Sequence, residues 1–182
     1  MNTTIEETSI TESSLERYEE AVKSYFDLES SEIFHNGKKE HAKIIIEQMF
    51  SRAEKSVHIF CKNLLAEVYN DTHLLRALHS CMHRGASVHV LVENEPQAKD
   101  FLMESSYLKQ KYPQKLSIRQ LGARSSAKKW GFNFAVMDAK AVRFEADKEQ
   151  SNAIASAHNE KLAAVVEAAF DVARVEAGLA CI

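Results

Sequence analysis

The chain has 182 residues, of which 45% are hydrophobic and 27% charged, and its formal net charge at pH 7 is −3. This length suits one domain with an appended segment, and it supports a core that needs no metal or disulfide. No apolar run reaches the roughly 20 residues of a membrane span, and the acidic start argues against a signal peptide. The three cysteines, Cys61, Cys81 and Cys181, lack zinc-like spacing. We therefore expect a cytoplasmic protein with reduced thiols, no membrane contact, no cofactor and no metal site.

The first predicted element is a helix from Ser13 to Leu28. Ser13 and Glu16 have the spacing of a capping box, which satisfies the free amide donors of a helix start. An apolar stripe at helical spacing then runs through Leu15, Tyr18, Val22, Tyr25 and Phe26. We expect residues 1–10 to be disordered, residues 1–34 to form an acidic helical extension, and residues 35–182 to form an α/β domain. The apolar stripe needs a partner surface, which favours a homodimer.

Helices and strands alternate along the rest of the chain. One predicted helix begins near Asn36, and three more cover Asp71–Arg84, Pro96–Lys111 and Ala157–Gly178. The predicted strands are Ser56–Cys61, Ser87–Glu93 and Lys115–Leu121, followed by a hairpin of Gly131–Asp138 and Ala141–Asp147. Gly85 stands where a left-handed residue would end a helix. This order predicts an α/β fold with a mixed, mostly parallel sheet flanked by helices.

Charge is divided unevenly between two segments. Residues 1–34 hold nine acidic residues against Arg17 and Lys23, whereas residues 109–143 hold nine basic residues against Asp138. The two segments could pair with each other, within one chain or across a dimer, or the basic segment could bind nucleic acid. We favour pairing between the segments.

Four sequence units within residues 40–176 follow one another in a characteristic order. They are the entry to the first strand through Ala53, Val57 and Ile59, the polar CKNL turn after it, the LHSCMHRGASVHVLVEN unit and the FNFAVMDAKAVRFEAD hairpin. Together they resemble one half of a phospholipase D-type protein. The resemblance implies an α/β fold in which two halves, often from a homodimer, build one phosphodiester site. In that family one His attacks phosphorus, a second His protonates the leaving oxygen, and lysines hold the phosphate.

The family's His-x-Lys-x-x-x-x-Asp motif is altered in this chain. If Asp138 stands for the motif Asp, Gly131 takes the His position and Asn133 takes the Lys position. Glycine offers no nucleophile, and asparagine offers a neutral donor in place of a cation. We therefore expect no catalytic residues and predict a non-catalytic, homodimeric interaction module that binds a protein or nucleic-acid partner.

Polar side chains cluster near the predicted strand ends, where ligands of open α/β sheets bind. The candidate pocket residues are Asn63, Glu93, Asn94, Asp138, Arg143, Glu145, His158 and Asn159. Alternatively, Arg143 and Glu145 pair with each other and the others serve as caps and turns. Two other functions would use the same pocket. One is a phosphodiesterase in which His158 acts with Arg143 and Glu145, and the other is a small-ligand sensor.

A second candidate surface is the basic loop after the third strand. Its residues are Arg124, Lys128, Lys129 and Trp130. Cations beside an aromatic ring can bind single-stranded nucleic acid, although such loops are also often simply solvated. His58 and His89 occupy equivalent points near the starts of two strands, away from the predicted pocket, and we expect them to be structural.

Overall fold

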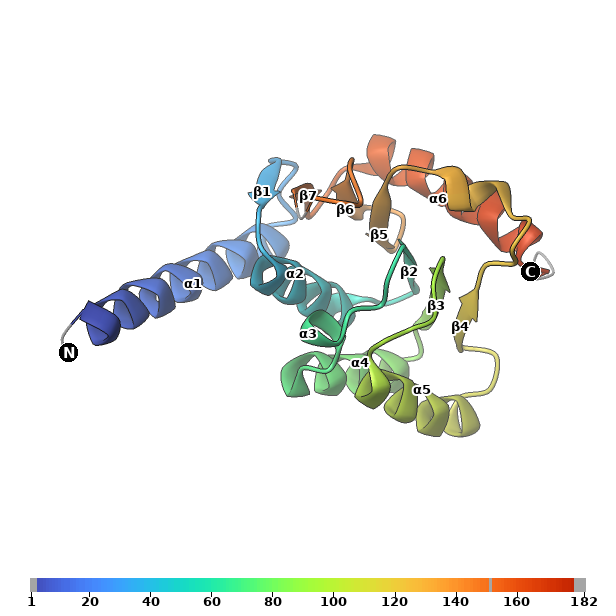
Figure 1. The fold of residues 1–182 in the computed structure, drawn as a ribbon, viewed down its shortest axis with the longest axis horizontal. Coiled ribbons are helices and arrows are strands. Elements are labelled where there is room, and N and C mark those ends of the chain that lie inside the picture. The colour runs from blue at the N-terminus through green and yellow to red at the C-terminus, as the bar shows by residue number, and fades with distance from the viewer. Residues whose placement is uncertain (1–2, 151, 179–182) are drawn as a thin grey trace.

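One mixed sheet organises the computed structural model, which describes residues 3–150 and 152–178 (Figure 1). Within these residues the sheet has seven strands in the order β1-β7-β6-β5-β2-β3-β4. The strands are β1 (Phe34–Asn36), β2 (Ser56–Cys61), β3 (Ser87–Val92), β4 (Leu116–Gln120), β5 (Asn133–Met137), β6 (Ala141–Glu145) and β7 (Ala153–Ser156). The predicted α/β class, a mixed sheet flanked by helices, is confirmed.

Parallel pairing is less extensive than predicted. β2 is parallel to β3 and β3 to β4, whereas the other neighbouring strands are antiparallel. The prediction of a mostly parallel sheet is wrong because β5, β6 and β7 follow one another without a crossover helix. β5 and β6 are joined through Asp138 and Ala139, whose φ angles of 53° and 56° are typical of a type I′ hairpin turn. β1 and β7 were not predicted, and each adds antiparallel pairing.

Helices cover both faces of the sheet (Figure 1). The helices after β1 are α2 (Lys39–Arg52), α3 (Ala66–Tyr69), α4 (Thr72–Arg84), α5 (Lys99–Lys111) and α6 (Glu160–Glu176), with a short 3-10 helix η1 (Ser126–Lys129). Val57 and Ile59 of β2 belong to the core beneath α2 and α4, whereas Phe60 packs with Phe170 on the α6 side. Burial on both faces explains the near-continuous apolar strands. Gly85 ends α4 with a φ of 94°, as predicted.

The N-terminal helix α1 (Thr3–Asp27) is longer than predicted, and its first part extends away from the rest of the molecule (Figure 1). Residues 3–10 are helical, so the expected disorder is wrong there, and residues 1–2 lie outside the described part. Ser13 is inside the helix and therefore does not cap it. The helix predicted to begin at Asn36 begins at Lys39 instead, because Asn36 pairs in β1.

The apolar stripe of α1 is covered within the same chain. Val22 and Phe26 are buried, and the rings of Tyr18 and Tyr25 stack on His41 and Phe34. Because α2 and β1 supply this surface, the stripe no longer argues for a second copy.

The two charged segments do not pair as favoured. α1 lies beside α2 and β1, whereas α5, β4 and η1 lie across the molecule from it (Figure 1). Among the described side chains, Lys140 is the one basic residue of residues 109–143 that pairs with an acid of residues 1–34, which is Glu29. Two other basic residues of that segment have partners elsewhere, because Arg143 pairs with Glu145 and Lys115 donates to the Gly85 carbonyl. Cys61 and Cys81 are buried free thiols, as predicted, and Cys181 lies outside the described residues.

His58 and His89 lie side by side between the sheet and α6. Their ring centroids are 5.6 Å apart, His58 Nδ1 is 2.6 Å from Glu167, and His89 Nδ1 is 2.8 Å from Ser117 Oγ. Burial, with smaller contributions from His58 and Arg174, lowers the pKa of His89 from its ordinary 6.5 to about 4.

The unfolded chain should therefore bind more protons than the folded chain between about pH 6.5 and pH 4. Stability is expected to fall as the pH drops through this window, by at most about 2 kcal/mol from His89 because solvent screens part of the ring. The matched variant is His89→Gln, which can still bond to Ser117 but does not titrate. Urea unfolding at several pH values should give a flatter profile for this variant. Equal profiles would contradict the prediction.

Candidate functional site

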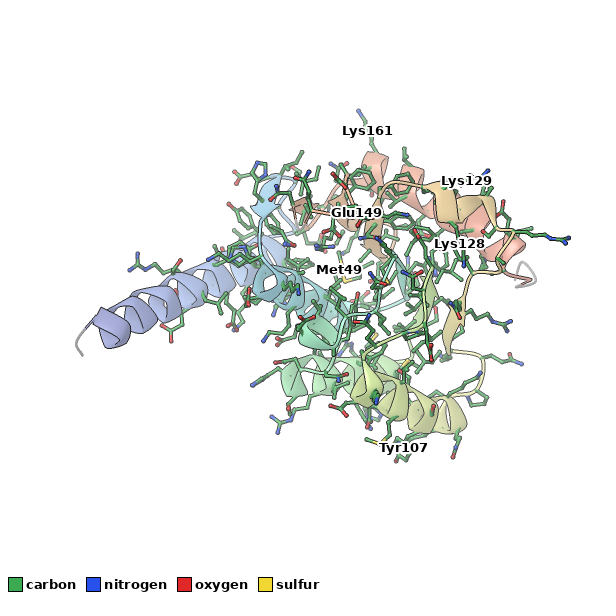
Figure 2. The ribbon with its side chains drawn as sticks, viewed as in Figure 1. Met49, Tyr107, Lys128, Lys129, Glu149 and Lys161 are labelled. Carbon is green, nitrogen blue, oxygen red and sulfur yellow. The ribbon has the colours of Figure 1, made fainter. Side chains whose placement is uncertain are left out.

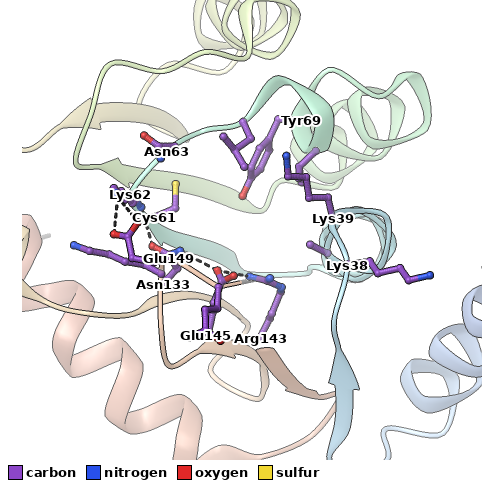
Figure 3. A pocket seen from close by; sticks show the side chains of 15 residues that line it. Lys38, Lys39, Cys61, Lys62, Asn63, Tyr69, Asn133, Arg143, Glu145 and Glu149 are labelled. Carbon is purple, nitrogen blue, oxygen red and sulfur yellow. Dashed lines mark hydrogen bonds and ion pairs between the residues drawn. The ribbon is translucent and has the colours of Figure 1, made fainter. Parts of the chain in front are cut away.

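A polar cavity of about 210 Å³ opens at the carboxyl end of β2 (Figure 3). The antiparallel pairing of β5 with β2, and of β6 with β5, brings the start of β5 and the end of β6 to the same edge. The first turn of α2 and helix α3 form the opposite wall. The residues used below are Lys38, Lys39, Cys61, Lys62, Asn63, Tyr69, Asn133, Arg143, Glu145, Lys148 and Glu149. This cavity is called the carboxyl-edge pocket.

A buried chain of polar contacts forms the floor of the carboxyl-edge pocket. Arg143 is 9% exposed, and its Nε donates to Asn36 Oδ1 over 2.8 Å. Its Nη1 lies 3.5 Å from Glu145 Oε2, which also accepts from Asn133 Nδ2 over 2.8 Å. Asn133 Oδ1 in turn accepts the Lys62 backbone amide over 2.8 Å. Arg143 and Glu145 therefore do pair with each other, and they line the pocket as well.

Two further ion pairs stand at the rim of the pocket. Lys148 Nζ contacts both carboxylate oxygens of Glu93 at 2.8 and 2.9 Å, and both side chains are largely buried. Lys62 Nζ contacts both oxygens of Glu149 at 2.6 and 2.7 Å, but the Glu149 side chain is 63% exposed. The Lys62–Glu149 pair is thus open to exchange with solvent and solutes.

The N-terminus of α2 also faces the pocket through Lys38 and Lys39. None of the described side chains caps this helix, and the first backbone bond runs from the Ala42 amide to the Lys38 carbonyl. The preceding amides of the first turn therefore have no partner within the helix. Free amides and the helix dipole both favour an anion at this position.

The pocket holds no activated nucleophile among the side chains described. Burial, aided by the charge of Glu93, raises the pKa of Cys61 to about 12, so its thiol stays protonated at neutral pH. Burial also raises the pKa of Tyr69. None of the described lining residues is a histidine. The arrangement can hold an anion, and its described lining offers neither a histidine nor a thiolate as nucleophile.

Five of the eight predicted pocket residues gather at this edge. Asn63, Arg143 and Glu145 line the pocket, Glu93 holds Lys148 at the rim, and Asn94 Nδ2 donates to Asn63 over 2.8 Å.

The other three lie at the opposite end of the sheet. Asp138 accepts backbone amides at the entry to β2, His158 lies 3.8 Å from Glu29, and Asn159 caps α6 by accepting from the Leu162 amide. Grouping them with the pocket is wrong because β7, which was not predicted, reverses the chain before α6. The phosphodiesterase site proposed around His158 therefore loses its histidine.

Lys62 was expected with Asn63 at this edge, because it directly follows β2 and residues at that end of a parallel strand line such sites. Other pocket residues were missed at the sequence level. Asn133 was noted only for its place in the altered motif. Lys148 and Glu149 were not considered, although they lie in the loop directly after β6, whose end the pairing with β5 brings to this edge.

The basic loop lies beside the pocket, but Trp130 is not a free platform. Its ring packs at 5.1 Å from Phe60 and 5.4 Å from Phe132, as part of the core under α6. The Lys128 carbonyl accepts from Lys148 Nζ over 3.3 Å, which joins η1 to the pocket rim. Arg124 and Lys129 are exposed, as the side-chain view of Figure 2 illustrates for Lys129.

The described residues contain no group of three or more His, Cys, Asp or Glu side chains arranged to hold a metal ion. No helix among them is long and apolar enough to cross a membrane.

Several solved structures are similar in fold to this chain. Nuc from Salmonella typhimurium, a phospholipase D family member, has a TM-score of 0.56 at 12% identity, covering 80% of this chain and 95% of its own. TrmBL2, an archaeal chromatin protein described as having a novel mode of DNA binding, has a TM-score of 0.55 at 14% identity, covering 92% of this chain. Polyphosphate kinase from Porphyromonas gingivalis has a TM-score of 0.51 at 11% identity, covering 80% of this chain.

The chain spans 62% of the TrmBL2 chain and 26% of the polyphosphate kinase chain. At these identities the likeness shows the fold alone, which is the phospholipase D-like fold that the sequence resemblance implied. The chain belongs to the family described as Domain of unknown function (DUF7931), whose model matches residues 38–176. None of the curated proteins matches it.

Proposed function

We propose that this chain is a non-catalytic phospholipase D-like module whose carboxyl-edge pocket binds a phosphate group of its partner. The observation that carries the proposal is the side-chain content of the pocket. Asn133, at the position of the family's Lys, is engaged by the Lys62 amide and Glu145, and Gly131, at the position of its His, has no side chain. A polar, cationic site remains where the resemblance places phosphodiester chemistry, and the reactive pair is gone.

The charge of the pocket supports an anionic ligand. Its lining contains the cations Lys38, Lys39, Lys62, Arg143 and Lys148 and the carboxylates Glu145 and Glu149. Two carboxylates outside the lining, Glu67 and Glu93, pair with Lys39 and Lys148. The uncapped start of α2 adds partial positive charge. Glu149, from an exposed loop, already places a carboxylate on Lys62, and a phosphate could replace it there.

Nucleic acid is the partner class that the surroundings favour. Lys128 and Lys129 continue the positive charge from Lys148 along η1, so a strand with one phosphate in the pocket can meet further cations. The fold is shared with a chromatin protein that binds DNA, which is a likeness of fold only. A homodimer and a cytoplasmic location remain predictions, and the dimer now rests on the family resemblance.

The test is the binding of a fluorescein-labelled oligothymidylate of about 16 nucleotides, followed by anisotropy. With three or four phosphate contacts, affinity should fall about tenfold or more between about 50 and 200 mM salt. Lys62→Ala should weaken binding about tenfold, because it removes a charged contact. Glu149→Gln should tighten binding, because it removes the competing carboxylate. Lys161→Ala, on the exposed start of α6, is the matched control and should bind like wild type.

The same mixtures report on catalysis, because the oligonucleotide should be recovered intact after long incubation. Cleavage that persists in purified protein would contradict the non-catalytic assignment. Equal affinities for wild type and Lys62→Ala would place any binding outside the pocket. Binding of inorganic phosphate without any binding of the oligonucleotide would favour the small-ligand sensor instead.

A further inference from the structure

The strand β4 leaves one edge of the sheet open. It pairs with β3 on one side, and the described residues supply no strand on the other. The Val88 amide donates to the Lys115 carbonyl, and the Leu121 amide donates to the Val92 carbonyl. Alternate residues of a parallel strand direct their amides and carbonyls to opposite sides, so Leu116, Ile118 and Gln120 direct theirs outward. These groups form a free edge that can accept another strand.

A groove of about 300 Å³ runs beside this edge, between β4 and α5. Its floor includes the side chains of Leu116 and Ile118 together with Leu102 of α5. Ser105, which is 5% exposed, also lines the groove, and its Oγ has no hydrogen-bond partner among the described residues. Side chains two residues apart on an added strand would point to this same face. The groove can therefore take alternate apolar side chains of a segment that pairs with β4.

The chain segment that contains the edge carries one sign of charge, and the carboxylate of Glu176 from α6 accepts from Ser125 and Ser126 within it. Residues 105–130 contain no Asp or Glu, and their basic residues are Lys109, Lys111, Lys115, Arg119, Arg124, Lys128 and Lys129. Two copies meeting edge to edge would bring these cations together, which disfavours a second copy as the occupant. The acidic helix α1 of the same chain lies across the molecule (Figure 1). An acidic segment from another protein complements the edge.

We propose that the β4 edge binds an extended, acidic segment of a partner protein, which adds as a strand and places alternate apolar side chains in the groove. The outward amides and carbonyls supply backbone hydrogen bonds, and the groove and cations supply selectivity. This proposal does not rest on the function of the carboxyl-edge pocket, because the groove shares no lining residue with that pocket, although both proposals use the cations Lys128 and Lys129. Nucleic acid could meet the same cations, but it has no use for the free amides or the apolar groove.

The probe is a fluorescein-labelled peptide of alternating glutamate and valine, titrated with the full chain and followed by anisotropy. Ile118→Pro removes an outward amide while leaving the bonds to β3 in place, as proline allows at a strand edge. Ile118→Val keeps the amide and is the matched control. We expect wild type and Ile118→Val to bind the peptide alike. Ile118→Pro should bind it about tenfold more weakly, because the hydrogen bond from the amide of residue 118 is lost and the proline ring stands in its place. A peptide with lysine in place of glutamate should not bind.

Amide hydrogen exchange tests the geometry without a variant, and so does not depend on the folding of Ile118→Pro. On adding the acidic peptide, the amides of Leu116, Ile118 and Gln120 should slow at least about tenfold, and those of Ser117 and Arg119 should not change. Absence of peptide binding, or binding without this alternating protection, overturns the proposal. If the oligothymidylate binds here and the peptide does not, the segment is a phosphate-binding surface and the proposal is wrong. Loss of oligonucleotide binding in Lys62→Ala leaves the peptide result unaffected, so the two proposals fail separately.

Discussion

Arg143→Met is expected to reduce the free energy of unfolding by about 3–5 kcal/mol. Methionine fills much of the space of the arginine stem, but it leaves two buried groups without their partner. Glu145, which is 8% exposed, loses its cation, and Asn36 Oδ1 loses the Nε donor. Removing one member of a buried ion pair costs more than the pair contributes, because the remaining charge keeps its desolvation penalty.

A double-mutant cycle measured by urea unfolding tests whether the unpaired charge of Glu145 causes the loss of stability. Glu145→Gln keeps an acceptor for Asn133 and removes the charge, so Arg143→Met combined with Glu145→Gln should recover part of the loss. The residual loss should reflect Asn36 and the altered packing. If the double variant is no more stable than Arg143→Met alone, the uncompensated carboxylate is not the cause. A loss below about 1 kcal/mol in the single variant would show that the site relaxes around the change.

Asp138→Ala is expected to reduce the free energy of unfolding by about 2–3 kcal/mol. The Asp138 carboxylate accepts the backbone amides of Glu54 and Lys55 at 2.9 Å and of Ser56 at 2.8 Å. It thereby ties the β5–β6 turn to the start of β2. Water can reach part of this site, so the loss is smaller than three buried charged bonds would give.

Ala139→Gly, in the same turn, is the matched control. Ala139 has a φ of 56°, which glycine adopts without steric strain, so this variant should be neutral or slightly more stable. Thermal unfolding followed by circular dichroism measures both variants. Equal midpoints for wild type and Asp138→Ala would show that the three amides gain nothing from the carboxylate.

The central part of the fold could be predicted because its signals are local. The β-branched runs of β2 and β3 and the Gly85 C-cap identify their elements without any tertiary information. The short strands β1 and β7 carry no such signal. β7 contains alternating alanines, which have a low strand propensity. β1 pairs with it through residues far apart in the sequence, such as Phe34 and Ala155, so β1 and β7 are strands only because of tertiary contact.

The same limit explains the candidate site. The rule that ligands bind at the carboxyl ends of parallel strands correctly placed Asn63, Glu93 and Asn94 at one edge. After β6, the end of the sheet at which a residue lies depends on how many strands precede it. Because β7 was not predicted, His158 and Asn159 were placed at the pocket edge instead of the opposite end of the sheet. Lys148 and Glu149 were not included in the predicted pocket.

The two margins of the sheet differ in a way that sets how many partners it can take. β1 is three residues long, and the carbonyl of His35 already accepts the hydroxyl of Tyr18 from α1 over 3.1 Å. The ring of Tyr25 packs on Phe34 from the same helix. The proposed strand addition is therefore expected at β4 and not at β1, with a stoichiometry of one segment per chain.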